Sequence, residues 1–203
     1  MGCSGDEPAE DTATEAPAEE TAEAEPSEEA TEETAEEEAA APSGDVAAPG
    51  DTAGLGEWLS LPFEVAGDDG GSAVIDVTVT EIEAAPDADQ KALQEEISQL
   101  KGMTVYYLWA DMKKNSGDEV AYSSIASEFY AVDENSEQLQ NISLIGWDSC
   151  PSESFTTEFD EGETLSTCFA AAVPDSQPAP AGGAWNDFED YNIYDGNALY
   201  WLQ

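Results

Sequence analysis

The chain has 203 residues, of which 47 are acidic and four are lysine, with no arginine and no histidine, so its formal net charge is −43. A field of this sign repels nucleic acids and anionic lipid headgroups, which excludes nucleic acid as a partner. The missing histidine removes the commonest general base and metal ligand, and the missing arginine removes bidentate phosphate recognition. We therefore predict a protein that is not an enzyme and has no cofactor and no metal centre.

The first residues predict a lipid anchor. Gly2-Cys3-Ser4-Gly5 resembles the end of a bacterial lipobox, in which a small residue precedes the cysteine that becomes the lipidated N-terminus. On this interpretation a signal peptide precedes the sequence in the gene, and Cys3 anchors the protein on the outer side of the cell membrane. A myristoylation pattern fails because it needs Ser or Thr at the position of Asp6. The alternative is an unmodified cysteine in a tail.

The segment that follows has the composition of a disordered tether. Residues 6–54 are nearly all Glu, Ala, Thr, Pro, Ser and Asp and contain no aromatic residue. Such a segment buries too little apolar surface to offset its ordering entropy, and like charges at helical spacing, as in Glu28 and Glu32, oppose a helix. We predict that residues 1–54 form the lipid-attachment site and a disordered acidic tether, and that one folded domain covers residues 55–203.

Alternating apolar residues predict the first two strands, over residues 57–65 and 74–82. Pro62 indicates that the first strand lies at the edge of a sheet, because proline cannot donate a ladder hydrogen bond. The alternation in the second strand predicts one buried face and one exposed face.

One helix is expected between these strands and the next. Leu93, Ile97 and Leu100 recur at helical spacing, which predicts a helix over residues 87–101. Asp87 or Asp89 is suited to cap its start. Its narrow apolar stripe indicates that it packs across the edge of the sheets.

Residues 101–117, KGMTVYYLWADMKKNSG, predict the central strand of the domain, ending in a turn at Asn115. In an extended conformation Leu108 and Met112 point to one face, and Tyr107 points to the other. Because both sets are apolar, we expect other parts of the protein to pack against both faces of this strand.

The remaining strands are predicted from shorter apolar segments, which in chain order are residues 120–125, 127–133, 142–147, 164–173 and 198–202. Residues 174–184, rich in Pro, Ala and Gly, are expected to connect the last two. About seven or eight short strands at roughly ten-residue spacing predict an all-β fold, an immunoglobulin-like β-sandwich with one inserted helix.

Cys150 and Cys168 lie at the two ends of one predicted connection. A disulfide between them would contribute on the order of 3 kcal/mol through loop entropy. A zinc site would need more soft ligands than this chain offers, and a reactive thiol is the other alternative. We expect the disulfide, which requires an oxidising compartment outside the cytoplasm.

The residues 185–194 form the best candidate for a ligand-binding surface, because they interleave aromatic and acidic side chains beside a Gly-rich segment. This composition suits a sugar or a peptide. The candidate binding residues are Trp185, Phe188, Tyr191 and Tyr194. The alternative is that these rings complete the hydrophobic core.

The order of the segments resembles a known family. A VTVTEIE strand is followed by GMTVYYLWADMKKNSGDE, by SEFYAVDEN, by a cysteine before FDEGETLSTCFAAAVP, and by a last strand ending in ALYWL. This order resembles the telokin-like, immunoglobulin-fold domain of actinobacterial secreted lipoproteins, a domain of unknown function related to the mycobacterial secreted immunogenic antigens. The resemblance spans residues 75–202.

The resemblance implies particular roles for a few residues. It implies lipidation of Cys3, a strand end at Lys114-Asn115 with Gly117, and a strand over residues 168–174 that follows Glu161-Gly162-Glu163. It also implies a location on the surface of a Gram-positive, actinobacterial cell. It implies no activity.

Together these features predict a lipid-anchored, extracytoplasmic binding or scaffold module with a cell-wall, protein or glycan ligand. One alternative is a calcium-binding surface protein. Asp190, Asn192, Asp195 and Asn197 carry oxygen ligands near Gly196, although their spacing does not fit an EF-hand loop. The other alternative is a carboxylate-dependent glycan hydrolase, but acidic residues are so frequent that no pair stands out.

Overall fold

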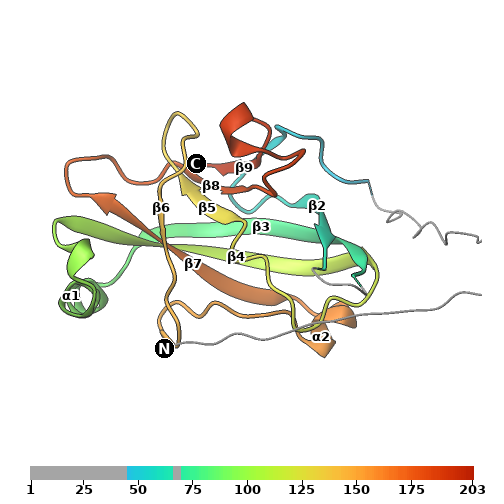
Figure 1. The fold of residues 1–203 in the computed structure, drawn as a ribbon, viewed down its shortest axis with the longest axis horizontal. Helices are drawn as coiled ribbons and strands as arrows, with labels where there is room; N and C mark the ends of the chain where they lie inside the picture. Colours follow the sequence, from blue (N-terminus) through green and yellow to red (C-terminus); the bar gives the residue numbers. More distant parts are fainter. Residues whose placement is uncertain (1–44, 66–69) are drawn as a thin grey trace, which may run out of the picture. The chain divides into compact units, whose positions relative to one another are not determined.

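The computed structural model of the protein describes residues 45–65 and 70–203. The predicted lipidation site at Cys3 and most of the predicted tether lie outside these residues. The described chain is mainly β and forms two sheets that face each other, with one helix inserted between strands (Figure 1). The all-β sandwich predicted from the sequence is therefore confirmed.

The sheets have the strand orders β1-β9-β8-β5 and β2-β3-β4-β7-β6. In chain order the elements are β1 (Thr52–Gly54), β2 (Leu59–Glu64), β3 (Ser72–Ala84), α1 (Asp87–Glu96), the short 3-10 helix η1 (Ser98–Leu100), β4 (Met103–Gly117), β5 (Phe129–Val132), β6 (Gln140–Ile142), α2 (Thr157–Asp160), β7 (Leu165–Pro174), β8 (Gly182–Trp185), the 3-10 helix η2 (Ile193–Asp195) and β9 (Leu199–Leu202).

Strand β4 is central, as predicted, and pairs antiparallel with β3 on one side and β7 on the other. Leu108 and Met112 face the core between the sheets, whereas Tyr107 belongs to a second apolar cluster on the opposite face. Cover on both faces is thus confirmed. The strand continues through the turn expected at Asn115 and ends at Gly117, where a Cβ atom would lie 2.4 Å from the Ser72 carbonyl oxygen.

The main core lies between the two sheets and is dominated by aromatic stacking. The ring of Phe129 on β5 lies 4.6 Å from that of Phe169 on β7 and 5.5 Å from that of Trp201 on β9, measured between centroids. These contacts join the sheets, because β7 belongs to the five-stranded sheet and the other two strands to the four-stranded one. Strand β2, which carries Pro62, is an edge strand as predicted.

The inserted helix is confirmed, but it packs on the outer face of the five-stranded sheet and not across its edge. Leu93 on α1 and Leu100 on η1 are buried against Tyr107. The helix ends at Glu96, because Ile97 is extended, so Leu100 reaches the cluster from a separate turn. The predicted capping by Asp87 or Asp89 is wrong: Pro86 occupies the N-cap position, and no side chain caps the helix.

Two predicted strands differ from the structure. Residues 120–125 form no strand, because the backbone N–H groups of Val120 and Ala121 donate to the carboxylate of Asp160, each at 2.9 Å. The strand expected at 142–147 lies earlier, as β6, and the residues after Ile142 fold over the sheet as a loop. The prediction for β3 was partly wrong: Val74 and Thr78 are buried as well, so the first half of this strand is covered on both faces.

Strands β1 and β8 had not been predicted. Strand β1 falls in the segment assigned to the tether, yet it pairs parallel with β9, so the folded part begins before residue 55. Strand β8 contains Gly182 and Gly183, which carry no strand signal in the sequence. A Cβ atom on Gly182 would lie 2.4 Å from the Trp201 carbonyl oxygen, so the close approach of β9 requires glycine there.

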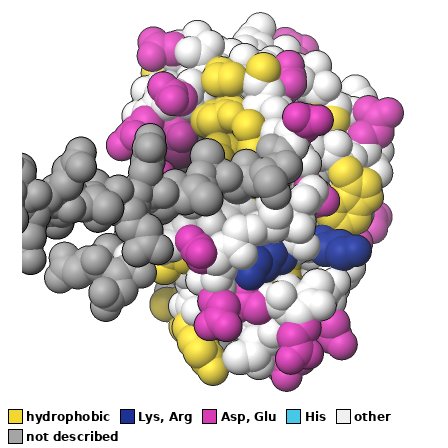
Figure 2. Space-filling view, turned by 90° about the vertical axis from the view of Figure 1, so that its right-hand side faces the viewer, with side chains coloured by type: hydrophobic (Ala, Val, Ile, Leu, Met, Phe, Trp, Pro, Cys, Tyr) yellow, Lys and Arg dark blue, Asp and Glu magenta, His cyan; other side chains and the backbone are white. Residues whose placement is uncertain are grey.

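The surface is acidic. Figure 2 shows acidic side chains spread over the visible face and lysine side chains confined to one part of it. Lys114 forms a nearly buried ion pair with Asp160, with 3.0 Å between Nζ and Oδ1, whereas the pair of Lys91 and Glu95 is exposed. Within the described ranges, no helix has the length and apolar character needed to cross a membrane.

Candidate functional site

The outer face of the four-stranded sheet carries the candidate site. Along β5 and β9 the residues alternate, so that Phe129 and Trp201 enter the core and Tyr130 and Tyr200 point outward. The strand register aligns Tyr130 with Ala184 on β8 and Ala184 with Tyr200. Two tyrosines thus flank one small residue in a row across this face.

The loop before β9 lies over this face and is held by its own side chains. The Oδ1 atom of the fully buried Asn186 accepts from the N–H groups of Phe188 (2.9 Å) and Ile193 (3.3 Å). The Oδ1 atom of Asp187 accepts from the N–H groups of Glu189 and Tyr191, at 2.8 and 3.0 Å. These bonds fix the backbone in one conformation, so the loop presents its exposed side chains at little entropic cost.

The four predicted binding aromatics divide into two pairs. Trp185 and Tyr191 are 2% and 6% exposed, with ring centroids 5.0 Å apart, and they belong to the main core. Their predicted role as ligand contacts is wrong, because burial removes both rings from the surface. Phe188 and Tyr194 are 47% and 76% exposed, so only these two are available to a ligand.

Phe188 is held in a conformation that a large side chain rarely adopts. Its φ angle is 64°, in the left-handed region, which costs roughly 1–2 kcal/mol. Its ring lies edge-on to that of Tyr130, with 6.0 Å between centroids. Burial, followed by the neighbouring Tyr194 and Glu128, raises the pKa of Tyr130. We call Tyr130, Phe188 and Tyr194 the aromatic surface.

Tyr194 also borders a groove of about 890 Å³. One wall is formed by residues 135–140, in the loop after β5 and at the start of β6. The other wall is formed by residues 193–196, and Tyr200 also lines the groove. Figure 1 shows both walls rising from the same side of the sheet, close to the C-terminus. The groove is lined by amide, hydroxyl and aromatic groups and contains no lysine.

The first wall is fixed to the sheet. Asp133 Oδ1 accepts from the N–H groups of Asn135 (2.8 Å) and Glu137 (2.9 Å), and these bonds lower the pKa of Asp133. Leu139 N–H donates to the Ala131 carbonyl at 2.9 Å. The groove therefore does not depend on a ligand for its shape.

Several polar side chains in the groove lack a partner within the part of the chain that the structure describes. The amides of Gln138 and Gln140 and the hydroxyls of Tyr194 and Tyr200 form no hydrogen bond there. The Oε1 atom of Gln138 is buried as well as unpartnered. The ring of Tyr200 is 4% exposed, and its burial raises the pKa of its hydroxyl.

The sequence did not identify Tyr130, Tyr200, Gln138 or Gln140 as site residues. Strand alternation would have indicated the outward direction of the two tyrosines, once the inward direction of Phe129 and Trp201 was known. The two glutamines carry no signal, because they lie in a polar segment at the end of a loop and the start of β6, and its contact with residues 193–196 is long-range.

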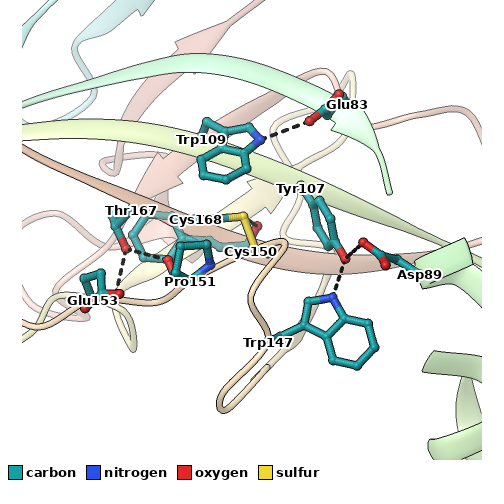
Figure 3. The surroundings of a disulfide bond; sticks show 11 residues. Glu83, Asp89, Tyr107, Trp109, Trp147, Cys150, Pro151, Glu153, Thr167 and Cys168 are labelled. Carbon is teal, nitrogen blue, oxygen red and sulfur yellow. Dashed lines mark hydrogen bonds between the residues drawn. A yellow bond between two sulfur atoms is a disulfide. The ribbon is translucent and has the colours of Figure 1, made fainter. Parts of the chain in front are cut away.

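The disulfide between Cys150 and Cys168 is confirmed, with 5.0 Å between the Cα atoms. It joins the loop after β6 to β7 beneath the second apolar cluster, beside a small polar network (Figure 3). There Tyr107 Oη donates to Asp89 Oδ2 at 3.1 Å and accepts from Trp147 Nε1 at 2.8 Å. Burial is the main cause that raises the pKa of Tyr107 to about 12. This network fixes α1 and the loop on β4 and serves the fold.

At least one of the residues considered as calcium ligands already forms an internal hydrogen bond. Asn192 Oδ1 accepts from Tyr194 N–H at 2.9 Å, as a cap of η2. Across residues 45–65 and 70–203, no group of three acidic or cysteine side chains is arranged to hold a metal ion. Burial raises the pKa of Glu128, but its hydrogen bond with Trp185 gives this carboxyl a structural role.

No protein-family model and no curated protein matches the chain. Among solved structures, the crystal structure of MPT63, a secreted protein from Mycobacterium tuberculosis, is similar with a TM-score of 0.48 and 15% sequence identity. The match covers 75% of this chain and 96% of that one. The telokin-like lipoprotein family that the sequence pattern resembles stays a prediction.

Proposed function

We propose that the protein is a non-enzymatic, extracytoplasmic binding module and that the groove with the aromatic surface holds its ligand. The observation that carries this proposal is the exposure of Phe188 and Tyr194 on a loop fixed by its own side chains, beside a preformed groove. Binding sites in proteins combine apolar contact area with a few fixed polar groups in a concave surface. A rigid loop also lowers the entropy lost on binding.

The location outside the cytoplasm is supported by the disulfide between Cys150 and Cys168, because cytosolic reductants keep such thiols reduced. The lipid anchor at Cys3 and the tether remain part of the proposal, supported by the lipobox-like residues and the acidic composition. In this arrangement the anchor holds the module on the surface of a Gram-positive cell, where it meets its ligand.

The charge of the groove limits the ligand. Glu137 and Asp195 line it and no lysine does, so anionic groups are repelled. The ligand is therefore uncharged or basic.

Binding is tested on the full-length, oxidised protein with isotope labelling. A panel of neutral oligosaccharides, neutral peptides and basic peptides is added, and amide chemical shifts are followed. We expect shifts confined to residues 135–140 and 193–196, and loss of about tenfold in affinity in Tyr194→Ala. Tyr122→Ala is the matched control, since this tyrosine is 83% exposed and lies outside the groove. Equal affinity of the two variants would exclude the groove.

The anchor is tested in cells that express the complete gene. We expect the protein in the membrane fraction with a diacylglyceryl group on Cys3, and release of Cys3→Ser into the medium. An unmodified Cys3 in the mature protein would contradict the anchor and leave the groove proposal intact.

A further inference from the structure

We infer that the ligand of the groove is a neutral, polyhydroxylated molecule of the carbohydrate class. This inference rests on the proposed binding function and names the chemistry that the groove is able to recognise.

Most of the backbone N–H groups of the two walls donate to internal acceptors. On the first wall, the N–H groups of Asn135 and Glu137 donate to Asp133 Oδ1, and that of Leu139 donates to the Ala131 carbonyl. On the second, Tyr194 N–H donates to Asn192 Oδ1, and Gly196 N–H donates to the Ile193 carbonyl. An extended peptide is recognised through free backbone groups at a strand edge. Of these wall residues Gln140 lies at such an edge, at the start of β6, whereas the N–H groups named above are engaged.

Side chains supply the polar groups that remain. Gln138 and Gln140 carry amides, and Tyr194 and Tyr200 carry hydroxyls, and each of these groups both donates and accepts. Sugar hydroxyls have the same dual capacity, so they match this set. A phosphate or carboxylate would meet no lysine here and would face Glu137 and Asp195.

Gln138 carries a buried polar atom that forms no hydrogen bond in the described chain. Its Oε1 atom is buried without a hydrogen bond, which costs about 1–3 kcal/mol. Because its amide has no partner in the described chain, the side chain is free to turn toward a ligand without breaking an internal bond. Once the side chain has turned, a donor hydroxyl in the groove would remove this cost.

The aromatic surface supplies the apolar contact that a sugar ring needs. The ring of Tyr194, 76% exposed, borders the groove and offers a flat apolar face to the C–H groups of a sugar ring. Amides on one wall and a tyrosine ring on the other would therefore contact the two chemical faces of one saccharide unit.

The test titrates the labelled, oxidised full-length protein with four probes of similar length: a neutral N-acetylglucosamine tetramer, a glucose tetramer, an end-capped tetra-alanine, and tetra-lysine. We expect at least one saccharide to shift the side-chain amide resonances of Gln138 and Gln140. Gln138→Met and Gln140→Met should each lose about tenfold in affinity, and Gln99→Met, an exposed glutamine outside the groove, should lose none.

A second readout separates binding from a structural role. Because Gln138→Met removes the unpartnered buried oxygen, we expect this variant to unfold at a higher temperature than the parent while it binds saccharide more weakly. A purely structural residue would not change stability and affinity in opposite senses.

The other outcomes are decisive in different ways. Saturable binding of tetra-alanine or tetra-lysine in the groove, with no response to either saccharide, overturns the carbohydrate class and leaves the binding function standing. Tetra-lysine binding that disappears with added salt and ignores Tyr194→Ala is diffuse charge attraction. Absence of a response in the groove to every probe overturns both the carbohydrate class and the proposed function.

Discussion

The indole Nε1 of Trp185 donates a hydrogen bond to Oε2 of Glu128 at 3.0 Å, and the Asn186 N–H donates to the backbone carbonyl of the same glutamate at 2.9 Å. The two contacts fix the start of the loop before β9 to Glu128, the residue that precedes β5. Burial, opposed by the bond from Trp185 and assisted by nearby Asp187, raises the pKa of Glu128 above its usual value of 4.5.

We predict that Glu128→Gln stabilises the protein at neutral pH. A raised folded pKa favours the protonated acid, so its contribution is present below about pH 4.5 and lost as the pH rises through the folded pKa. Glutamine keeps an acceptor for Trp185 without the charge. Urea unfolding should show a gain of a few tenths to about 1 kcal/mol at pH 7, with solvent screening allowed for, and none at pH 4. Glu189→Gln, on the exposed part of the loop, controls for lower net charge, and an equal gain there would contradict the prediction.

We predict that the disulfide is a main source of stability. Replacing Cys150 and Cys168 together with serine should lower the free energy of unfolding by about 2–4 kcal/mol, because the unfolded chain regains the entropy of the closed loop. Dithiothreitol should destabilise the parent by a similar amount and leave the double variant unchanged. Two reactive thiols at these positions in the unreduced, denatured protein would show that the bond does not form.

We predict a large loss from breaking the ion pair of Lys114 and Asp160. Burial raises the pKa of Asp160, but the bonds from Val120, Lys114 and Ala121 outweigh it and hold the pKa below its usual value. The stabilisation is therefore present above about pH 4 and disappears as the pH falls through the folded pKa. Asp160→Asn should cost about 2–4 kcal/mol at pH 7, and the cost should fall progressively as the pH is lowered below about 4. Lys91→Ala, which breaks an exposed pair, should cost less than about 0.5 kcal/mol.

We predict that glycine at position 122 stabilises the protein and alanine does not. Tyr122 is 83% exposed with a φ angle of 71°, so its side chain contributes little packing and its backbone is strained. Glycine removes the strain at some cost in unfolded-chain entropy, for a net gain of about 0.5–1 kcal/mol. Alanine retains the Cβ atom and the strain. A thermal unfolding series in which both variants match the parent would contradict this prediction.

The long strands β3, β4 and β7 were all predicted from the sequence, because each is a long alternating or continuously apolar segment. Burial follows the alternation over part of β4, whereas β7 and the first half of β3 are buried on both faces. Strand β8 was missed because Gly182 is selected by the approach of β9, which no local pattern records. Residues 120–125 were predicted as a strand from a short apolar segment, but the backbone N–H groups of Val120 and Ala121 donate to Asp160.

The candidate site was only half predictable for a similar reason. The run 185–194 contains both exposed and buried rings, and periodicity does not tell one from the other in a loop. Which rings are exposed is decided by the loop conformation, which Asn186 and Asp187 fix. Their side chains accept hydrogen bonds from backbone N–H groups up to seven residues later in the chain. The groove glutamines lie in a different segment, just before and at the start of β6, and only the tertiary fold brings this segment close to residues 193–196.

The parallel pairing of β1 with β9 has a mechanical consequence. The Asp51 carbonyl accepts from the N–H of Tyr200, and Thr52 pairs with Tyr200 in the register. Tension applied to the chain ahead of β1 would first load Ala47, which bonds Ser60 and Tyr191, and would then reach this short ladder and Tyr200, which lines the groove. A force that pulls the protein from its N-terminal end would thus be transmitted to a residue that lines the groove.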